Sequence, residues 1–187
     1  MSSNNPTIPT RRRFLHHSAR LAAASALPAL STPARALVPG VRALAFVHTH
    51  TQERIDLVYA RHEHYVPAAL GSLNHFLRDH YTGEVGAIDP RMFDLLHQVH
   101  TALAAKHPFE VISAYRCAAT NTKLRQARGG GVARHSLHLE GRAIDVRLTG
   151  VALADLRDAA LLLRAGGVGF YPREQFVHID TGRVRSW

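Results

Sequence analysis

The sequence predicts an α+β domain with a small antiparallel sheet and helices packed on one side of it. Segments with apolar residues at helical spacing come first along the chain, and short segments that can pair as an antiparallel sheet come later. Residues 37–187 contain no linker, internal repeat or low-complexity stretch, and their number suits one domain. We therefore expect one continuous domain over this range.

The first half of this range predicts a hairpin and two helices. Residues 44–50 and 53–60 are each rich in alternating apolar residues, as in paired strands. A helix is expected from Pro67, because proline is accepted in a first turn and apolar residues follow it at helical spacing. A second helix is expected from Asp89-Pro90, because aspartate caps helices and proline fits the next position.

The second half predicts strands separated by short helices. Strands are expected over residues 110–116, 142–148, 168–171 and 176–180, helices over residues 119–127 and 151–164, and a mobile loop at Gly129-Gly130-Gly131. In the strand at 142–148, Ala143, Asp145 and Arg147 share one face, while Ile144 and Val146 point toward the core. Asp145 is then a carboxylate on a largely buried strand, which needs a partner or a metal ion.

The first 36 residues have the features of an export leader. Thr10-Arg11-Arg12-Arg13-Phe14-Leu15 carries a twin-arginine signature, residues 21–30 are rich in alanine and leucine, and Ala34-Arg35-Ala36 offers a cleavage site. The apolar stretch is short for a bilayer span. We expect a signal peptide that directs the folded protein through the twin-arginine export machinery to the periplasm, with no stable membrane span in the mature form. A basic tail and an uncleaved membrane anchor are the alternatives.

Net charge argues against a nucleic-acid partner once the leader is set aside. The chain carries 23 lysines and arginines and 14 acidic residues. The leader holds five arginines and no acid, so residues 37–187 carry 18 basic and 14 acidic side chains, a net charge of +4. This charge suits an anionic polymer such as the cell wall, and no basic run interleaved with aromatic residues suggests nucleic-acid binding. The single cysteine, Cys117, is expected to be a small buried packing residue.

Three residues have the types and number expected of a catalytic zinc site. His138 and Asp145 lie seven positions apart, and His178 follows within the strand expected at 176–180. A zinc ion that does chemistry takes three nitrogen or oxygen ligands and keeps one position open. Gly141 allows a sharp turn that can bring His138 back toward Asp145. On spacing alone, the alternative is a set of packed or surface histidines.

The wider pattern around these residues resembles a known family. SxHxxGxAxD over residues 136–145, followed by VHxD over residues 177–180, is similar to the zinc peptidases of peptidase family M15, in the superfamily of D-Ala-D-Ala metallopeptidases and hedgehog domains. The likeness is strongest to its exported murein endopeptidase K branch. The matching stretches, between about residue 45 and Trp187, include Arg78-Asp79, Thr82–Glu84, Ile88–Pro90, Ser113–Arg116, Asn121, Gly167–Pro172 and Asp180–Trp187.

The resemblance implies the hedgehog/D-Ala-D-Ala-peptidase fold, with Zn²⁺ held by His138, Asp145 and His178. A bound zinc ion lowers the pKa of its water from about 16 to about 7. Arg116 matches the SxxR arginine of the superfamily, and its fixed charge and fork of donors suit an oxyanion or the carboxylates of a peptide stem. The alternative for Arg116 is a surface salt bridge.

The general base departs from the family pattern. Relatives place a glutamate three residues before the last ligand, or a histidine two residues before it, where this chain has Gln175 and Phe176. Asp180 shares a strand face with His178 and is the first candidate, either as the base or as the residue that holds His178 in place. The other candidates are His135 and Glu174.

Together these observations predict a zinc-dependent murein endopeptidase that hydrolyses cross-links between the peptide stems of peptidoglycan. The resemblance favours links between stems that contain D-amino acids, including the direct link between two diaminopimelate residues. Two alternatives remain. One is a D,D-carboxypeptidase that trims terminal D-alanine, and the other is a non-catalytic wall-binding domain, which the missing glutamate suggests.

Overall fold

The computed structural model of the chain describes residues 40–127 and 133–187. The expected leader, residues 1–36, and the expected loop Gly129-Gly130-Gly131 lie outside these ranges. Within the described ranges, no helix is long and apolar enough to cross a lipid bilayer.

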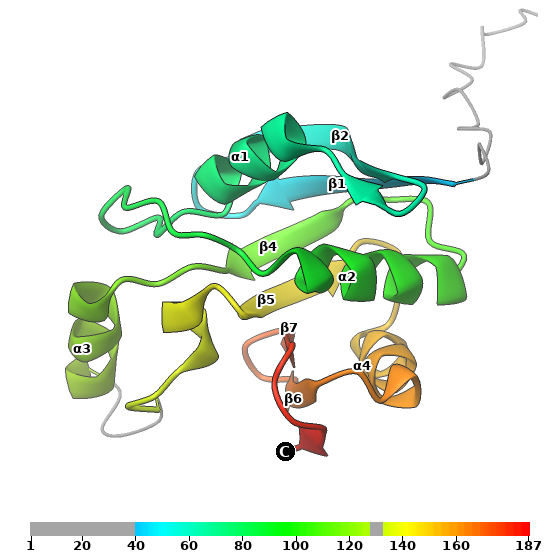
Figure 1. The fold of residues 1–187 in the computed structure, drawn as a ribbon. Coiled ribbons are helices and arrows are strands. Elements are labelled where there is room, and N and C mark those ends of the chain that lie inside the picture. Colours follow the sequence, from blue (N-terminus) through cyan, green and yellow to red (C-terminus); the bar gives the residue numbers. More distant parts are fainter. Residues whose placement is uncertain (1–39, 128–132) are drawn as a thin grey trace, which may run out of the picture. The chain divides into compact units, whose positions relative to one another are not determined.

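One sheet organises the described part of the chain (Figure 1). Its strands are β1 (Val41–His48), β2 (Arg54–Arg61), β3 (His64–Tyr65), β4 (Phe109–Ser113), β5 (Ala143–Leu148), β6 (Gly167–Tyr171), β7 (Phe176–Asp180) and β8 (Arg185–Ser186). They lie in the order β3-β2-β1-β4-β5-β7-β6-β8. Neighbouring strands are antiparallel except for β1 with β4 and β6 with β8, which are parallel. This order places β5 beside β7, although a helix and a strand separate them in the sequence.

Three helices pack on one face of the sheet. Helices α1 (Pro67–Phe76), α2 (Pro90–Ala102) and α4 (Leu153–Leu163) contribute buried side chains to one core cluster, which also includes Ile144 and Val146 of β5. Helices α2 and α4 also contact each other. Figure 1 shows α3 (Ala118–Ala127) set apart from these three. Because Ile144 and Val146 point into the helix-covered core, Asp145 between them points to the opposite face.

Local sequence explains where the helices begin. The Asp89 carboxylate accepts a hydrogen bond from the backbone N–H of Arg91 at 3.0 Å, which caps α2, and Pro90 occupies its first turn. Helix α1 likewise begins at a proline, Pro67, but has no side-chain cap. The amphipathic pattern of α2 then buries one face, which includes Met92, Leu95, Leu96 and Val99, in the core.

The predicted fold class is confirmed: the chain is α+β, with helices on one side of a sheet. Each strand and helix expected within the described ranges is present, with ends shifted by a few residues. The sheet has more strands than expected, because β3 and β8 have two residues each and show no alternation to detect. Two of the pairings are parallel, whereas an antiparallel sheet was expected. The alternation within one strand does not determine which strand lies beside it or in which direction.

Candidate metal centre

Strands β5 and β7 place Asp145 and His178 directly opposite each other. The two strands are antiparallel, and their register pairs Asp145 with His178. Side chains at paired positions point to the same face, so both lie on the face opposite the helices. The Nδ1 atom of His178 lies 2.8 Å from Oδ1 of Asp145. Two residues that are 33 positions apart in sequence therefore meet through sheet pairing alone.

His138 reaches the same place from a single turn of 3₁₀ helix, η1 (Leu137–Glu140). The Ser136 hydroxyl accepts a hydrogen bond from the backbone N–H of His138 at 3.4 Å at the start of this turn. Gly141 ends it with φ of 64°, a left-handed conformation that glycine adopts without steric cost. A Cβ atom at Gly141 would lie 1.9 Å from the backbone oxygen of Ala87, so the chain also passes too close for any side chain.

The three predicted ligands converge as expected for one metal ion. His138 Nε2 lies 3.3 Å from Asp145 Oδ1, and one ligand atom from each of His138, Asp145 and His178 lies within 4.8 Å of the others. All three side chains are largely buried. Two imidazole nitrogens and one carboxylate oxygen form the donor set of a catalytic zinc site, which leaves a coordination position open. The donor set therefore fits zinc.

Each histidine has one ring nitrogen held by another group. His138 Nδ1 donates to the backbone oxygen of Ala114 at 2.6 Å, so this nitrogen carries the proton and Nε2 is available to a metal. His178 Nε2 lies 3.1 Å from Oδ2 of Asp180, which leaves Nδ1 facing Asp145. Acceptors that hold the second nitrogen of a ligating histidine fix its tautomer and orientation.

Asp180 is fully buried and surrounded by donors. Its Oδ1 accepts from the backbone N–H groups of Gly167 and Gly182 and from Arg185 Nη1. Its Oδ2 accepts from Arg185 Nη2 at 2.7 Å and faces His178 Nε2. The structure therefore ties Asp180 to the ring of His178, on the side away from Asp145.

Burial and hydrogen bonding set the protonation of these groups in the metal-free protein. Burial alone would raise the pKa of Asp145, but His138 and His178 lower it below its usual range. Burial also lowers the pKa of His138, which outweighs the opposite effect of Asp145, so this ring is neutral. For His178, burial lowers the pKa, but hydrogen bonds to Asp145 and Asp180 raise it to about 8. Burial would likewise raise the pKa of Asp180, but hydrogen bonds from His178, Arg185 and two backbone N–H groups lower it.

Arg116 lies beside the ligand carboxylate. It follows β4, and its Nη2 atom lies 3.1 Å from the Ser113 hydroxyl and 3.4 Å from Oδ2 of Asp145. Its backbone N–H donates to the backbone oxygen of His138 at 3.1 Å, which ties the arginine to the turn that carries the first ligand. With 9% of its surface exposed, this arginine is not a surface salt bridge. A buried guanidinium next to the ligands can stabilise negative charge that develops on a bound group.

The other candidates for the base lie in more open positions. His135 is exposed in the segment before η1, and Glu174 is exposed in the turn between β6 and β7. The side chain of Gln175, three residues before His178, donates to the backbone oxygen of Pro172. Phe176 is buried and stacks with Tyr171 at a ring-centroid distance of 4.5 Å.

Three contacts at this site were not anticipated from the sequence. They are the Ala114 carbonyl on His138, the Arg185 guanidinium on Asp180, and the ring of Trp187 beside that of His178. A backbone carbonyl carries no residue-type signal, so the first could not be found. Arg185 and Trp187 lie in the matched segment at residues 180–187, and only the position of β8 beside β6 brings them near the site.

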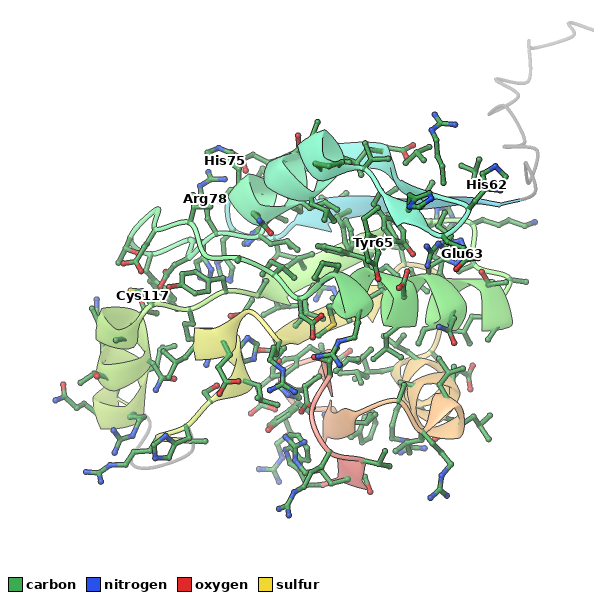
Figure 2. The ribbon with its side chains drawn as sticks, viewed as in Figure 1. His62, Glu63, Tyr65, His75, Arg78 and Cys117 are labelled. Atoms are coloured by element: carbon green, nitrogen blue, oxygen red, sulfur yellow. The ribbon has the colours of Figure 1, made fainter. Side chains whose placement is uncertain are left out.

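Cys117 is buried next to Arg116, as expected of a small packing residue. Figure 2 shows it beside the first turn of α3. Its backbone N–H donates to Oδ2 of Asp79 at 2.9 Å, and its sulfur contacts the hydroxyl of Thr120 at 3.5 Å. These contacts join α3 to the segment that follows α1.

Comparison with known proteins identifies close relatives over nearly the whole chain. The family model described as peptidoglycan L,D-endopeptidase MepK matches residues 36–187. The peptidoglycan L,D-endopeptidase MepK of Escherichia coli strain K12 is 42% identical over 179 residues, which cover 95% of this chain and 96% of the relative. The probable peptidoglycan L,D-endopeptidase MepK of Haemophilus influenzae is 39% identical over 150 residues, 80% of each chain. No solved structure matches significantly.

Proposed function

Because the chain belongs to the peptidoglycan L,D-endopeptidase MepK family of peptidases, we propose that it is a zinc-dependent endopeptidase that hydrolyses peptide cross-links of peptidoglycan in the periplasm. The observation that carries the proposal is the convergence of His138, Asp145 and His178, each with a ligand atom within 4.8 Å of the others. Relatives that bear the name of a peptidoglycan endopeptidase support the substrate class.

The three ligands are arranged to hold zinc without rearrangement of their rings. His138 presents Nε2 and His178 presents Nδ1, because the other nitrogen of each ring is held by Ala114 or Asp180. Asp145 presents Oδ1 between them. A bound zinc ion would supply hydroxide at neutral pH and polarise a carbonyl group.

Arg116 is our candidate for stabilising the oxyanion formed when the amide is attacked. It is buried, fixed by Ser113 and Asp145, and always charged. Its position beside the ligand set means that an amide carbonyl brought to the site lies near a cation. This electrostatic contribution is commonly the largest single one in acyl transfer.

Asp180 is our candidate for the residue that holds His178. Asp180 is fully buried, and both of its oxygens accept hydrogen bonds. This supports a role in orienting His178. A general base, in contrast, must exchange a proton with the reacting groups. The two roles predict different activities for an Asp180→Asn variant at saturating zinc. His135 and Glu174 remain the alternative bases.

One experiment tests the proposed function directly. Purified residues 37–187, loaded with zinc, are incubated with cross-linked peptidoglycan, and the soluble products are identified by mass spectrometry. We expect monomeric muropeptides from dimers joined by direct diaminopimelate links, loss of activity with a chelator, and its return with zinc. Release of free D-alanine without loss of dimers would indicate the D,D-carboxypeptidase. Intact dimers with zinc bound would indicate a wall-binding domain.

Export by the twin-arginine route is part of the same proposal, and the motif at residues 10–15 supports it. Replacing Arg11 and Arg12 by lysine keeps the charge but removes the pair that this pathway recognises. The variant should accumulate in the cytoplasm at its full length, whereas the native chain is expected in the periplasmic fraction. Equal periplasmic amounts of the two proteins would contradict the route.

A further inference from the structure

A half-exposed tryptophan lies against one of the proposed metal ligands. The ring of Trp187 is 5.3 Å from the ring of His178, centroid to centroid, and tilted by 51°. Half of the Trp187 surface remains exposed. Its backbone is fixed beside β6, because its N–H donates to the oxygen of Val168 and its oxygen accepts from the N–H of Phe170. The indole therefore occupies a defined position at the edge of the metal centre.

Side-chain contacts hold the indole in this position. Its Nε1 donates to the Tyr171 hydroxyl at 2.7 Å, and the Arg185 guanidinium lies 4.8 Å from the ring centroid. Arg185 is in turn bound to Asp180, which also faces His178. Trp187 in turn contacts His178, so these four side chains are joined in one continuous set of contacts.

The strand beneath the indole has no side chain at the point of contact. Gly169 pairs with His178 across β6 and β7. A Cβ atom at Gly169 would lie 2.7 Å from the indole, closer than real Cβ atoms approach. The glycine therefore makes room for the ring next to His178.

We propose that Trp187 contacts the substrate, and that its exposed indole packs against methyl and methylene groups of the stem peptide next to the scissile amide. The inference rests on the proposed function. Five large apolar side chains are among the most exposed in the described ranges: Tyr81, Val85, Leu162, Val184 and Trp187. Of these, Trp187 is the one in ring contact with a proposed ligand. An indole whose position is already fixed loses little conformational entropy on binding, and such residues carry much of the energy of recognition.

The chemistry of the contact follows from the charges around the ring. The positive charge of Arg185 is compensated by Asp180, so this corner offers an apolar surface rather than a free cation. We therefore expect the indole to contact the hydrocarbon part of the peptide and not the sugars of the glycan strand.

Tryptophan fluorescence reports on Trp187 alone, because it is the single tryptophan of the chain. Addition of Co²⁺ to the metal-free protein should quench the emission, since the indole lies beside a ligand. Cross-linked stem peptides freed of their glycan are then mixed rapidly with the zinc-loaded protein and followed before turnover. We expect a change in emission and a drop in quenching by acrylamide, because the exposed half of the Trp187 surface becomes covered. A response that requires the sugars, or no change in emission with the peptides, would overturn the proposal. Absence of quenching by Co²⁺ would instead contradict the proposed metal centre.

Variants separate substrate contact from support of the metal ligand. Trp187→Ala should raise KM about tenfold, as expected for loss of about 1.4 kcal/mol of binding, with kcat and zinc content nearly unchanged. Trp187→Phe should recover most of the difference. Leu162→Ala, which removes an exposed apolar side chain on α4, is the control and should match the native protein. Loss of zinc in Trp187→Ala with an unchanged KM at saturating zinc would show a structural role only.

Failure of this inference differs from failure of the proposed function. If the stem peptides are hydrolysed but leave the emission of Trp187 unchanged, the substrate contact is wrong and the endopeptidase stands. If the peptides are neither hydrolysed nor detected by fluorescence, both proposals are wrong.

Discussion

The Nε2 atom of His178 lies 3.1 Å from Oδ2 of Asp180, a carboxylate with no exposed surface. Asp180 follows His178 by two positions on the same strand, so both side chains point to one face of the sheet. The contact fixes the ring with Nδ1 toward Asp145. The pair therefore determines which nitrogen of His178 a bound metal ion would meet.

Replacing Asp180 by asparagine is expected to weaken zinc binding more than it changes the chemistry. Loss of a carboxylate that orients a ligating histidine commonly costs about 10-fold to 100-fold in metal affinity. Hydrolysis should return at saturating zinc, as measured by activity against zinc concentration. If Asp180 is the general base, hydrolysis stays low at saturating zinc and the acidic limb of the pH profile disappears. Asp155→Asn, the same change at an exposed position on α4, is the matched control.

His138→Ala and His178→Ala are each expected to remove both zinc and hydrolysis. Two remaining ligands do not form the three-ligand site that a catalytic zinc ion requires. Zinc content by mass spectrometry and muropeptide release are the measurements. His64→Ala, an exposed histidine on β3, serves as the control for general loss of a histidine. Full zinc content in either ligand variant would contradict the proposed metal centre.

Arg116→Ala should keep zinc but slow hydrolysis by about a hundredfold or more, the effect of a lost oxyanion donor. Because Arg116 is 3.4 Å from Asp145 and not itself a ligand, the metal centre should remain assembled. The measurement is kcat at saturating substrate together with zinc content. Zinc loss equal to that of the ligand variants would instead give Arg116 a structural role.

Zinc affinity should rise with pH up to about 8 and then level off. In the metal-free protein the pKa of His178 is raised to about 8, so below this pH zinc must displace its proton. His138 and Asp145 already lack the competing proton at neutral pH, since the pKa of each is lowered. The affinity is thus expected to increase about tenfold per pH unit between pH 6 and 7.5. Competition with a dye of known metal affinity measures it, and a flat profile would be inconsistent with a protonated His178.

Gly141→Ala is expected to destabilise the fold and displace His138. The backbone at φ of 64° costs about 1–2 kcal/mol for a side-chain residue, and overlap with the Ala87 oxygen adds about 1–3 kcal/mol. Gly83→Ala is the matched control, because Gly83 has φ of 78° and no atom within 4 Å of an added Cβ. Denaturant unfolding should show the larger loss for Gly141→Ala. Equal losses of unfolding free energy in the two variants would mean that the backbone at Ala87 moves away from the added methyl group at little cost.

The sequence was informative where side-chain type and local periodicity carry the signal. Alternation around Asp145 predicted its strand, and proline with aspartate predicted the start of α2. The arrangement of strands could not be predicted in the same way, because β1 and β4 pair across 60 residues and a strand's own pattern does not select its partner. The two-residue strands β3 and β8 are too short to show a period.

At the candidate metal centre, too, the sequence predicted what side-chain types reveal and missed what depends on the three-dimensional arrangement. Residue types and the family pattern placed His138, Asp145 and His178 together, and the structure brings them within reach of one ion. The surroundings of Asp180 depend on Arg185 and on two backbone N–H groups, Gly167 and Gly182. Backbone donors are common to almost all residues, so only the three-dimensional arrangement reveals that Asp180 is enclosed.

The direct pairing of Asp145 with His178 means that uptake of the proposed metal ion would depend on correct pairing of β5 with β7. A slip of one residue between β5 and β7 would turn one of the two side chains to the opposite face, and the ion could no longer be held. His178 lies on the second strand of the β6–β7 hairpin, so uptake would follow formation of that hairpin. The ratio of zinc to protein in a preparation would then count the molecules whose strands have aligned correctly.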